Sequence, residues 1–510
     1  MAVAMPLLAM RFGGVVFGLV CVTAVAGCDV VFGLDHLEPG QAARPDAAEP
    51  RVHGRLWERY VTNGSDLSPL VLERTYPATS VALSVTLDDG TDAPVTYHDD
   101  GTFELTRDRD DQPYRLVITV DGLPNEYQLD APELAIPQIV AGRPDAAPLG
   151  KSLLQFSYAP QVVDLKAAQV ASTGVYSLTN TGAYGPVVTM DWRTAAPTAN
   201  ARLGMLDASK NDRVYVLESR VDRISHPPLA YQVITAVTSA AVTQVVGQSI
   251  LLPQPTPVVH DDCATLNAPN ASVASRLQTA VGRSYPYVGG DWYVFAAPAP
   301  EQLGVTAPVV LASAGQIPPV DSTVTASFHD PFPGWPLLAQ AGALGGFDVQ
   351  LPDTSTPLRF YDAIRRYRTV PHDTAACDLP AQDMPATIAI AGDFELAGSP
   401  LDVDGSVLAL PDADVELTWR AVAAGDVHYT SVLLEELIPV DGFTTSIARR
   451  WITTAGDRVL IERALFVPGK TYVIAVTFHT GRPNAATGDW TPSGDTIEFA
   501  TTWSHYFVVQ

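Results

Sequence analysis

Basic residues are scarce in this sequence, and lysine is the scarcer of the two. The chain holds 31 lysines and arginines against 56 aspartates and glutamates, a formal net charge of −25 at pH 7. Its lysines stand at four positions: Lys151, Lys166, Lys210 and Lys470. Because a surplus of negative charge repels phosphate groups, it nearly excludes nucleic-acid binding by bulk electrostatics. We therefore predict no nucleic-acid partner.

Recognisable catalytic motifs are missing as well. The sequence has no Gly-x-Ser-x-Gly nucleophile elbow, no His-Glu-x-x-His zinc motif and no Gly-x-x-x-x-Gly-Lys phosphate-binding loop. These absences exclude the classes of exported hydrolase that a short motif reveals, although they do not exclude every enzyme. They favour a non-catalytic protein, and we predict no cofactor.

What the chain does have is a globular composition over 510 residues, with 47% apolar and 17% charged residues. Such a chain buries hydrophobic cores instead of remaining disordered. At about 150 residues per domain, its length predicts three or four domains.

One long apolar run lies near the N-terminus. Residues 12–27 are uncharged, follow Arg11, and are fewer than the ~20 apolar residues that cross a membrane. The run ends in Val25–Cys28 (Val-Ala-Gly-Cys), which resembles the lipobox of bacterial lipoproteins. The resemblance implies that residues 1–27 are a signal peptide and that Cys28 becomes a lipidated N-terminus carrying acyl chains such as palmitate. A signal peptide cleaved without lipidation remains the alternative.

Lipidation would define the location of the protein. Two acyl chains suffice for stable membrane attachment, so the membrane is the partner predicted for Cys28. The predicted location is the bacterial cell envelope, at the outer membrane or cell surface rather than the inner membrane. Residues 28–50 then form an acidic tether rich in proline and alanine, which we expect to be extended.

Cysteine is also rare, with four residues in the chain. If Cys21 leaves with the signal peptide and Cys28 carries the lipid, Cys263 and Cys377 remain. An exported pair in an oxidising compartment predicts a disulfide between them.

Histidine and acidic residues lie just before both of these cysteines. The candidate ligands are His260, Asp262, His372 and Asp373. A disulfide would bring them to one point, and imidazole and carboxylate groups are ligands for zinc and other divalent ions. Polar turns beside a structural disulfide are the simplest interpretation. A metal site beside the disulfide, and a zinc site made of the two histidines and two reduced cysteines, remain alternatives.

The mature chain divides into three β-rich blocks, of which the first spans residues 51–148. Apolar and small residues alternate over Val81–Leu87, and Asp-Asp-Gly turns follow at 88–90 and 99–101. The order of strands and turns resembles carboxypeptidase-regulatory or transthyretin-like modules. That resemblance implies a small β-sandwich without catalytic residues.

The middle block, residues 149–380, has the least regular pattern. We predict strands at 187–192, 213–217, 231–237, 292–296 and 324–328, and short helices at 163–171 and 273–281. Proline clusters at 253–257 and 331–336 interrupt any long element. The pattern fits one large sandwich or two smaller ones.

The third block, residues 381–510, is clearer. Val415–Trp419 alternates as a strand with a tryptophan on its inner face. Phe466–Val476 resembles the E–F corner and F strand of fibronectin type III domains, in which a Pro-Gly turn leads to a tyrosine that bonds back to the backbone. The resemblance implies an immunoglobulin-like sandwich that presents partners or spaces other domains.

Aromatic residues gather in three places along the chain. They are Tyr285, Tyr287, Trp292 and Tyr293, then Phe328, Phe332 and Trp335, and finally Trp490, Trp503 and Tyr506. Buried, they form ordinary cores; exposed, they stack on sugar rings or anchor a protein partner.

Together these features predict an all-β fold of tandem β-sandwich domains behind a lipoprotein signal and tether. The high ratio of arginine to lysine, the lipobox and the sandwiches resemble the large envelope lipoproteins of myxobacteria and their relatives. The predicted function is that of a non-catalytic binding or scaffold module whose partner is an envelope protein or glycan. A glycan-binding lipoprotein and a metal-assisted hydrolase centred near Cys263 and Cys377 are the alternatives.

Overall fold

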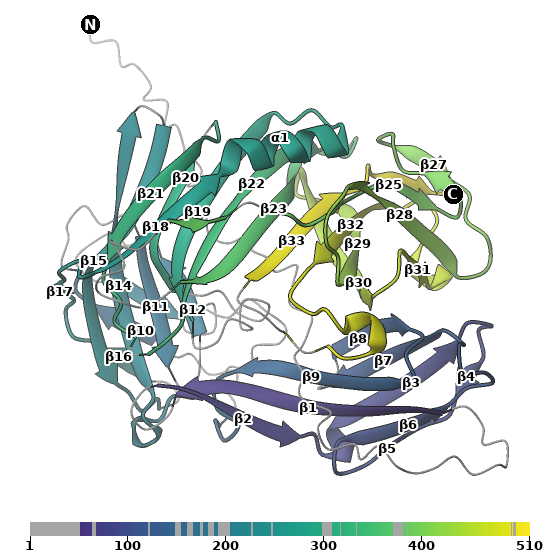
Figure 1. The fold of residues 1–510 in the computed structure, drawn as a ribbon, viewed down its shortest axis with the longest axis horizontal. Coiled ribbons are helices and arrows are strands. Elements are labelled where there is room, and N and C mark those ends of the chain that lie inside the picture. The colour runs from purple at the N-terminus through teal and green to yellow at the C-terminus, as the bar shows by residue number, and fades with distance from the viewer. Residues whose placement is uncertain are drawn as a thin grey trace, which may run out of the picture.

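The protein is all-β in a computed structural model, and the predicted fold class is confirmed (Figure 1). The structure describes residues 51–63, 68–120, 123–147, 155–160, 167–173, 177–181, 188–191, 205–225, 228–245, 248–297, 309–316, 318–332, 334–370, 381–384, 386–490, 492 and 496–510. Its helical elements are α1 (Asn270–Val281) and the 3-10 turns η1 (Ala78–Ser80), η3 (Ala208–Lys210), η6 (Arg463–Leu465) and η7 (Ala485–Thr487). None of the helices described here has both the length and the apolar character that a membrane span requires.

The first block forms a β-sandwich along the lower edge of Figure 1. Its strands are β1 (Arg51–Asn63), β2 (Pro69–Thr75), β3 (Val81–Leu87), β4 (Asp92–Ala93), β5 (Val95–Tyr97), β6 (Thr102–Thr106), β7 (Tyr114–Val120), β8 (Leu123–Leu129) and β9 (Glu133–Ala141). One layer has the order β2-β1-β6-β5, with β9 parallel to β1, and the other layer contains β4, β3, β7 and β8.

Alternation of apolar and polar residues explains how this sandwich closes. Burial alternates strictly along β7, which turns Leu116 and Ile118 inward. They belong to one core with Trp57 and Phe103, which come from the other layer. Because the period of a strand is two, the sequence pattern was sufficient to predict this buried face.

Both predicted Asp-Gly turns connect strands of the sandwich. Asp89 accepts hydrogen bonds from the backbone N–H and the hydroxyl of Thr91, at 2.9 and 2.6 Å. Asp100 makes the same pair of bonds with Thr102. The Asp-Asp-Gly-Thr sequence therefore forms the same local structure twice, with positive φ at the glycine in each case.

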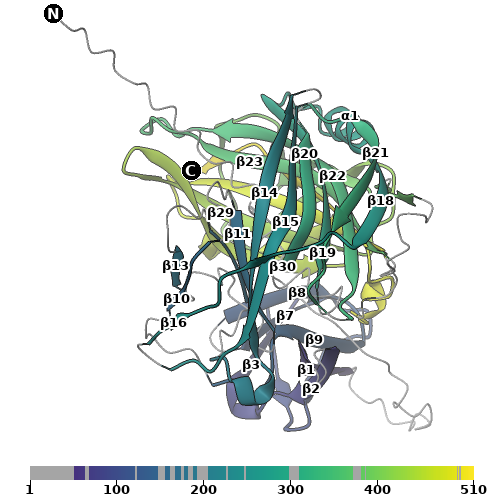
Figure 2. The same ribbon diagram turned by 90° about the vertical axis from the view of Figure 1, so that its left-hand side faces the viewer.

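The middle block contains most of the long strands. They are β10 (Gln155–Tyr158), β11 (Ala167–Thr173), β12 (Ser177–Thr181), β13 (Val188–Asp191), β14 (Arg213–Ser225), β15 (Pro228–Ala241), β16 (Ser249–Leu251), β17 (Thr256–Pro257), β18 (Asp262–Pro269), β19 (Tyr287–Ala296), β20 (Val309–Gln316), β21 (Asp321–Phe328), β22 (Leu337–Val349) and β23 (Leu358–Val370). The five predicted strands are all present, and β14 and β15 form the long hairpin that faces the viewer in Figure 2.

One of the two predicted helices is correct and the other is wrong. Helix α1 contains the predicted segment 273–281 and turns Val273 and Leu277 into the core. In contrast, residues 167–173 form β11, which lies between β12 and β14. Small residues fit either conformation, so pairing with two neighbouring strands decided the outcome where local propensity could not.

Strand β22 is buried on both faces, and its glycines make room for larger neighbours. A Cβ atom at Gly345 would lie 2.7 Å from the ring of Tyr285. The missing side chain lets that ring pack directly on the strand, where the Tyr285 hydroxyl donates to Asp362 Oδ2 at 2.7 Å. A glycine inside this strand therefore positions a buried hydrogen bond.

The third block completes the protein at the right of Figure 1. Its strands are β24 (Gln382–Asp383), β25 (Ile390–Leu396), β26 (Ser399–Pro400), β27 (Ser406–Leu408), β28 (Val415–Ala423), β29 (Tyr429–Val440), β30 (Phe443–Thr454), β31 (Arg458–Ile461), β32 (Thr471–His479), β33 (Thr496–Trp503) and β34 (Phe507–Val509). The hydroxyl of Tyr472 accepts from Val467 N at 2.8 Å and donates to Leu465 O at 3.1 Å. This back-bonding is what the resemblance to the fibronectin corner led us to expect.

The three blocks share hydrogen-bonded structure. Strand β8 of the first block runs parallel to β30 of the third, and β23 of the middle block pairs with β33. A sheet of 19 described strands therefore runs through all three blocks. Tyr127 and Tyr429 both pack edge-on against Trp490, so the first and third blocks also share a core.

Candidate functional site

Strand β18 places the predicted site at one end of the small sheet β21-β18-β24. Cys263 is buried on this strand and lies opposite Ser327 of β21. Cys377 falls outside the described residues, so its pairing with Cys263 stays a prediction.

Two of the four predicted metal ligands, His260 and Asp262, lie among the described residues. His260 Nε2 lies 2.7 Å from the carbonyl oxygen of Ile234, so this ring nitrogen bonds to the backbone. Asp262 is buried and accepts a hydrogen bond from Asp330 N at 3.2 Å. His372 and Asp373 lie outside the described residues. Within the described part of the chain, no group of three or more His, Cys, Asp or Glu side chains is placed to hold a metal ion.

A hydrogen-bonded pair that the sequence did not predict lies beside Cys263. His329 Nδ1 is 3.0 Å from Asp261 Oδ1, and this hydrogen bond lowers the pKa of Asp261. The signal was the strand register: Asp262 lies opposite Phe328, so the next residues outward, Asp261 and His329, meet. The sequence does not reveal that β18 and β21 pair, so His329 could not be assigned as the partner of Asp261.

An open groove of about 410 Å³ lies at the other end of the same sheet. Its lining is mixed: Asn267, Ala268, Pro269, Asp321, Ser322, Thr323 and Asp383. Asn267 was missed in the sequence because amide and hydroxyl side chains on a strand carry no motif. The groove forms because Asn267 of β18 lies opposite Thr323 of β21 and beside Asp383 of β24.

Hydrogen bonds fix the polar groups of the groove. The Asn267 amide donates to Asp383 Oδ1 at 2.6 Å and accepts from the Thr323 hydroxyl at 2.7 Å. Asp321 accepts from the backbone N–H of Ser272 at 3.0 Å, in the first turn of α1. Carboxylate, amide and hydroxyl groups with an alanine and a proline suit a ligand that offers hydrogen bonds and some apolar surface.

The aromatic clusters form cores. Trp292, Phe328, Phe332 and Trp335 belong to one core, and each is at most 1% exposed. Trp490 is buried between the first and third blocks, and Trp503 packs on Phe360 with ring centroids 4.6 Å apart. Of the alternatives in the sequence, burial is the one that the structure supports for these rings.

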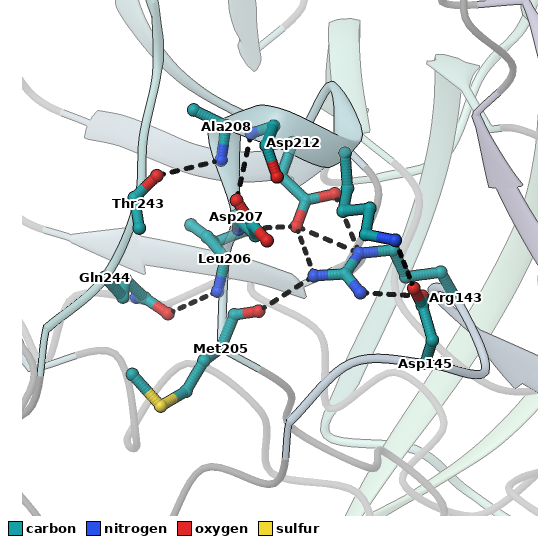
Figure 3. Close-up of polar contacts among 11 residues, drawn as sticks. Arg143, Asp145, Met205, Leu206, Asp207, Ala208, Asp212, Thr243 and Gln244 are labelled. Atoms are coloured by element: carbon teal, nitrogen blue, oxygen red, sulfur yellow. Dashed lines mark hydrogen bonds and ion pairs between the residues drawn. The ribbon is translucent and has the colours of Figure 1, made fainter.

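Buried charges connect separate parts of the chain. Arg143, just after β9, forms a bidentate pair with Asp212 through its Nε and Nη2 atoms, and Nη2 also donates to Met205 O (Figure 3). Asp145 bridges Arg143 and Lys210, at 2.7 and 3.0 Å. Burial raises the pKa of the fully buried Asp212 carboxyl, and the Arg143 guanidinium opposes that effect. These pairs connect the first block to the start of β14.

A second buried carboxyl connects the middle and third blocks. Asp362 Oδ2 accepts from Arg283 Nη1 at 2.9 Å and from the Tyr285 hydroxyl, and Oδ1 accepts from Trp503 N at 2.7 Å. Burial raises the pKa of Asp362, and Arg283 counters it. The three donors to this buried carboxyl come from both the middle and the third block, which indicates a structural role.

The fold and the site define an all-β multidomain protein with an open polar groove. No family model and no curated protein matches the chain. Among solved structures it is similar to the FN1-FN3 domains of chicken CNTN1, with 8% identity over 88% of this chain and 99% of that one, at a TM-score of 0.13. It is also similar to the N-terminal eight Ig domains of Down Syndrome Cell Adhesion Molecule isoform 1.30.30, with 8% identity over 89% and 70% and a TM-score of 0.09. Such TM-scores show no common arrangement in space, so the function is argued from the residues of this chain.

Proposed function

We propose that this chain is a non-catalytic binding or scaffold protein of a bacterial envelope, attached to a membrane by a lipid on Cys28. The observation that carries the scaffold role is the sheet of 19 described strands that runs through all three blocks. Strands paired across block boundaries hold the blocks in fixed positions, whereas flexible linkers would let them move independently. A rigid body of this kind holds a binding surface in a constant orientation.

The groove on β18 is the surface to which we assign partner binding. Its amide, carboxylate and hydroxyl groups converge from three strands, and hydrogen bonds between them fix their positions before a partner arrives. Amide and hydroxyl groups are common to peptides and glycans, so an envelope protein or an envelope glycan is the proposed partner.

The attachment rests on Val25–Cys28 and on the apolar run before it. Small residues before the cysteine fit cleavage, and acyl chains on Cys28 would hold the protein on the membrane. Residues 29–50 would then separate the β-structure from the lipid.

Mass spectrometry of the protein extracted from its own membrane tests the attachment. We expect an N-terminal peptide that begins at Cys28 and carries diacylglycerol. A mature chain that begins at another residue, or that carries no lipid, would contradict the proposal.

Photo-crosslinking in intact cells tests the groove. A photoreactive phenylalanine analogue replaces the exposed, groove-lining Thr323, and the control carries it at Asp111, an exposed residue of the first block. We expect a discrete product from position 323 and none from position 111. Peptides of a second protein in the mass spectrum of that product identify a protein partner, whereas a mass that periodate oxidation changes identifies a glycan. Equal labelling at both positions would reject the groove as the binding surface.

A further inference from the structure

The hairpin of β29 and β30 ends in an apolar face that projects beyond the sheet. The last residue of β29 that pairs with β32 is Leu437, so residues 438–445 extend past that neighbour. Val440 lies opposite Phe443, and Glu436 lies opposite Ile447, which places these side chains on one face of the hairpin. We call Ile438, Val440, Phe443 and Ile447 the tip face.

Three of the four residues of the tip face are exposed, and Ile438 is half-buried. Val440 is 44% exposed, Phe443 is 55% exposed and Ile447 is 43% exposed. Single exposed apolar residues are common, but a cluster on one projecting element marks a site of contact.

The hairpin is held along the outer edge of β30 and from its buried face. Gly442 O accepts from Ser355 N at 2.8 Å, and the backbone N–H of Thr444 donates to Thr356 O at 2.9 Å. The buried Thr444 hydroxyl bonds to Thr354 Oγ1 at 2.7 Å. Positive φ angles of 50° and 82° at Asp441 and Gly442 form the tight turn. The tip face is therefore held in one conformation, so it loses little conformational entropy when it makes a contact.

Local charge differs from that of the whole protein. Arg449 and Lys470 both pair with the buried Glu436, and each keeps part of its side chain in solvent. Together with Asp441 at the turn, these four groups sum to zero, in a chain whose net charge is −25. These four groups therefore add no net repulsion of phosphate groups, which is compatible with contact with a zwitterionic surface.

We propose that the tip face inserts into the interfacial region of a lipid bilayer and orients the protein on the membrane. This inference rests on the proposed lipid at Cys28, which would keep a bilayer close at all times. The 22 residues between Cys28 and Arg51 span at most about 75 Å when extended, so the bilayer lies within reach while the lipid alone fixes no orientation.

The size of the tip face favours a bilayer over a protein. A stable protein interface buries roughly 800 Å² on each partner, which four side chains do not supply. A shallow apolar tip that includes a phenylalanine, flanked by two cations, instead suits the boundary between lipid headgroups and acyl chains.

Vesicle flotation with an unlipidated chain tests the proposal. A signal peptide without a lipobox replaces residues 1–28, and the purified protein is mixed with phosphatidylcholine vesicles. We expect the chain to float with the vesicles and the double variant Phe443→Ser, Ile447→Ser to partition about tenfold less. The matched control, Val403→Ser with Val407→Ser, removes two valines that are 59% and 63% exposed elsewhere and should leave partition unchanged.

A second measurement locates the tip directly. In the variant Phe443→Trp, brominated lipids should quench fluorescence more than they do in the parent protein, whereas Val407→Trp should add no quenched signal. No vesicle binding by the parent chain, equal partition of both serine variants, or an unquenched Trp at position 443 would each overturn the proposal. Sedimentation that shows self-association lost with Phe443→Ser would assign the tip face to a second copy instead, which also overturns it.

Failure of this inference and failure of the proposed attachment are distinguishable. Lipidation is measured by the mass of the Cys28 peptide, whereas flotation uses a chain that carries no lipid. If the native protein is lipidated but its unlipidated form does not bind vesicles, membrane insertion of the tip face is refuted and the lipid attachment stands. If the native protein carries no lipid but its tip face binds vesicles, the lipid attachment is refuted and membrane insertion of the tip face stands.

Discussion

Arg276 and Glu498 bind the same short segment of backbone from its two edges. Arg276, on α1, donates to the carbonyl oxygens of Ala386 and Ile388. Glu498, on β33, accepts from the backbone N–H groups of Thr387 and Ile388 at 2.8 and 2.6 Å. The entry into the third block is therefore held by two charged side chains that satisfy its donors and acceptors separately.

Removing the charge from Glu498 should destabilise the protein. The variant Glu498→Gln weakens both backbone hydrogen bonds. It also removes the buried negative charge that pairs with Arg366, whose Nη1 lies 2.8 Å from Glu498 Oε1 in the parent protein. We expect a loss of about 2–3 kcal/mol in the free energy of unfolding, measured with urea. The control Glu416→Gln breaks an exposed pair with Arg458 and should cost less than about 1 kcal/mol. Equal effects of the two variants would show that the segment is held by other contacts.

Loss of Arg143 should be more severe. In Arg143→Met the fully buried Asp212 carboxylate loses its guanidinium partner, and we expect a cost of about 3–5 kcal/mol. The control Arg109→Met removes an exposed arginine that pairs with Asp88, which should change stability by less than about 1 kcal/mol. The second variant Arg143→Met with Asp212→Leu removes both charges and should recover part of the loss. No recovery would indicate that packing, and not the unpaired charge, causes the defect.

The hydroxyl of Tyr472 should contribute to stability in a way that the hydroxyl of Tyr287 does not. Tyr472→Phe removes the bonds to Val467 N and Leu465 O, and we expect a loss of about 1–2 kcal/mol. The hydroxyl of Tyr287 is buried without a hydrogen-bond partner among the described residues, so Tyr287→Phe should be neutral or slightly stabilising. Chemical unfolding of both variants checks this, and a costly Tyr287→Phe would mean that its hydroxyl has a partner elsewhere.

Acid should destabilise the protein through His479. Burial, with a smaller effect of Arg482, lowers the pKa of His479 to about 3, whereas the unfolded chain titrates near 6.5. As the pH falls from 6.5 toward 3, the unfolded state gains a proton that the folded state rejects. The contribution of His479 to the free energy of unfolding is therefore fully present above pH 6.5, and it decreases by about 1.4 kcal/mol for each pH unit below that value.

The variant His479→Gln tests this assignment because glutamine can still bond to Ser431, whose hydroxyl lies 2.8 Å from His479 Nε2. Its unfolding free energy should depend less steeply on pH between 4.5 and 6.5 than that of the parent. Parallel slopes for parent and His479→Gln would assign the acid sensitivity to other groups.

The predicted disulfide has its own test. Under non-reducing conditions the mature chain should weigh about 2 Da less than its reduced form, and one peptide should contain both Cys263 and Cys377. A bridge that closes a loop of more than 100 residues contributes up to about 4–5 kcal/mol, so Cys263→Ser should lower the unfolding midpoint. Free thiols at both positions in the exported protein would contradict the pairing.

Local patterns predicted a large part of the secondary structure. Burial alternates along β7 and β28 as their residues alternate in polarity, and Trp419 is buried as expected. The Asp-Gly turns and the Tyr472 corner also formed, because each depends on contacts between residues fewer than ten positions apart. The predicted helix at 163–171 was wrong over residues 167–171, because that segment pairs with a strand on each side, and residues 163–166 lie outside the described residues.

The candidate site was predicted less well because its parts come from distant strands. The sequence indicated the neighbourhood of Cys263, but the pairing of Asp261 with His329 depends on the register of β18 and β21. The groove needs a third strand as well, since Asp383 reaches Asn267 from β24. Neither polar spacing nor composition reveals which strands will be neighbours.

By itself, the sequence determined the all-β class, the alternating strand faces and the local turns, since each follows from steric and solvation preferences over a few residues. It also carries the lipobox-like motif on which the proposed lipid attachment rests. Tertiary structure alone decided that β8 pairs with β30, that Arg143 meets Asp212 and that Arg276 and Glu498 hold one segment between them. Those contacts join residues that are tens to hundreds of positions apart, and their energies arise only once folding has brought the partners together and removed them from water.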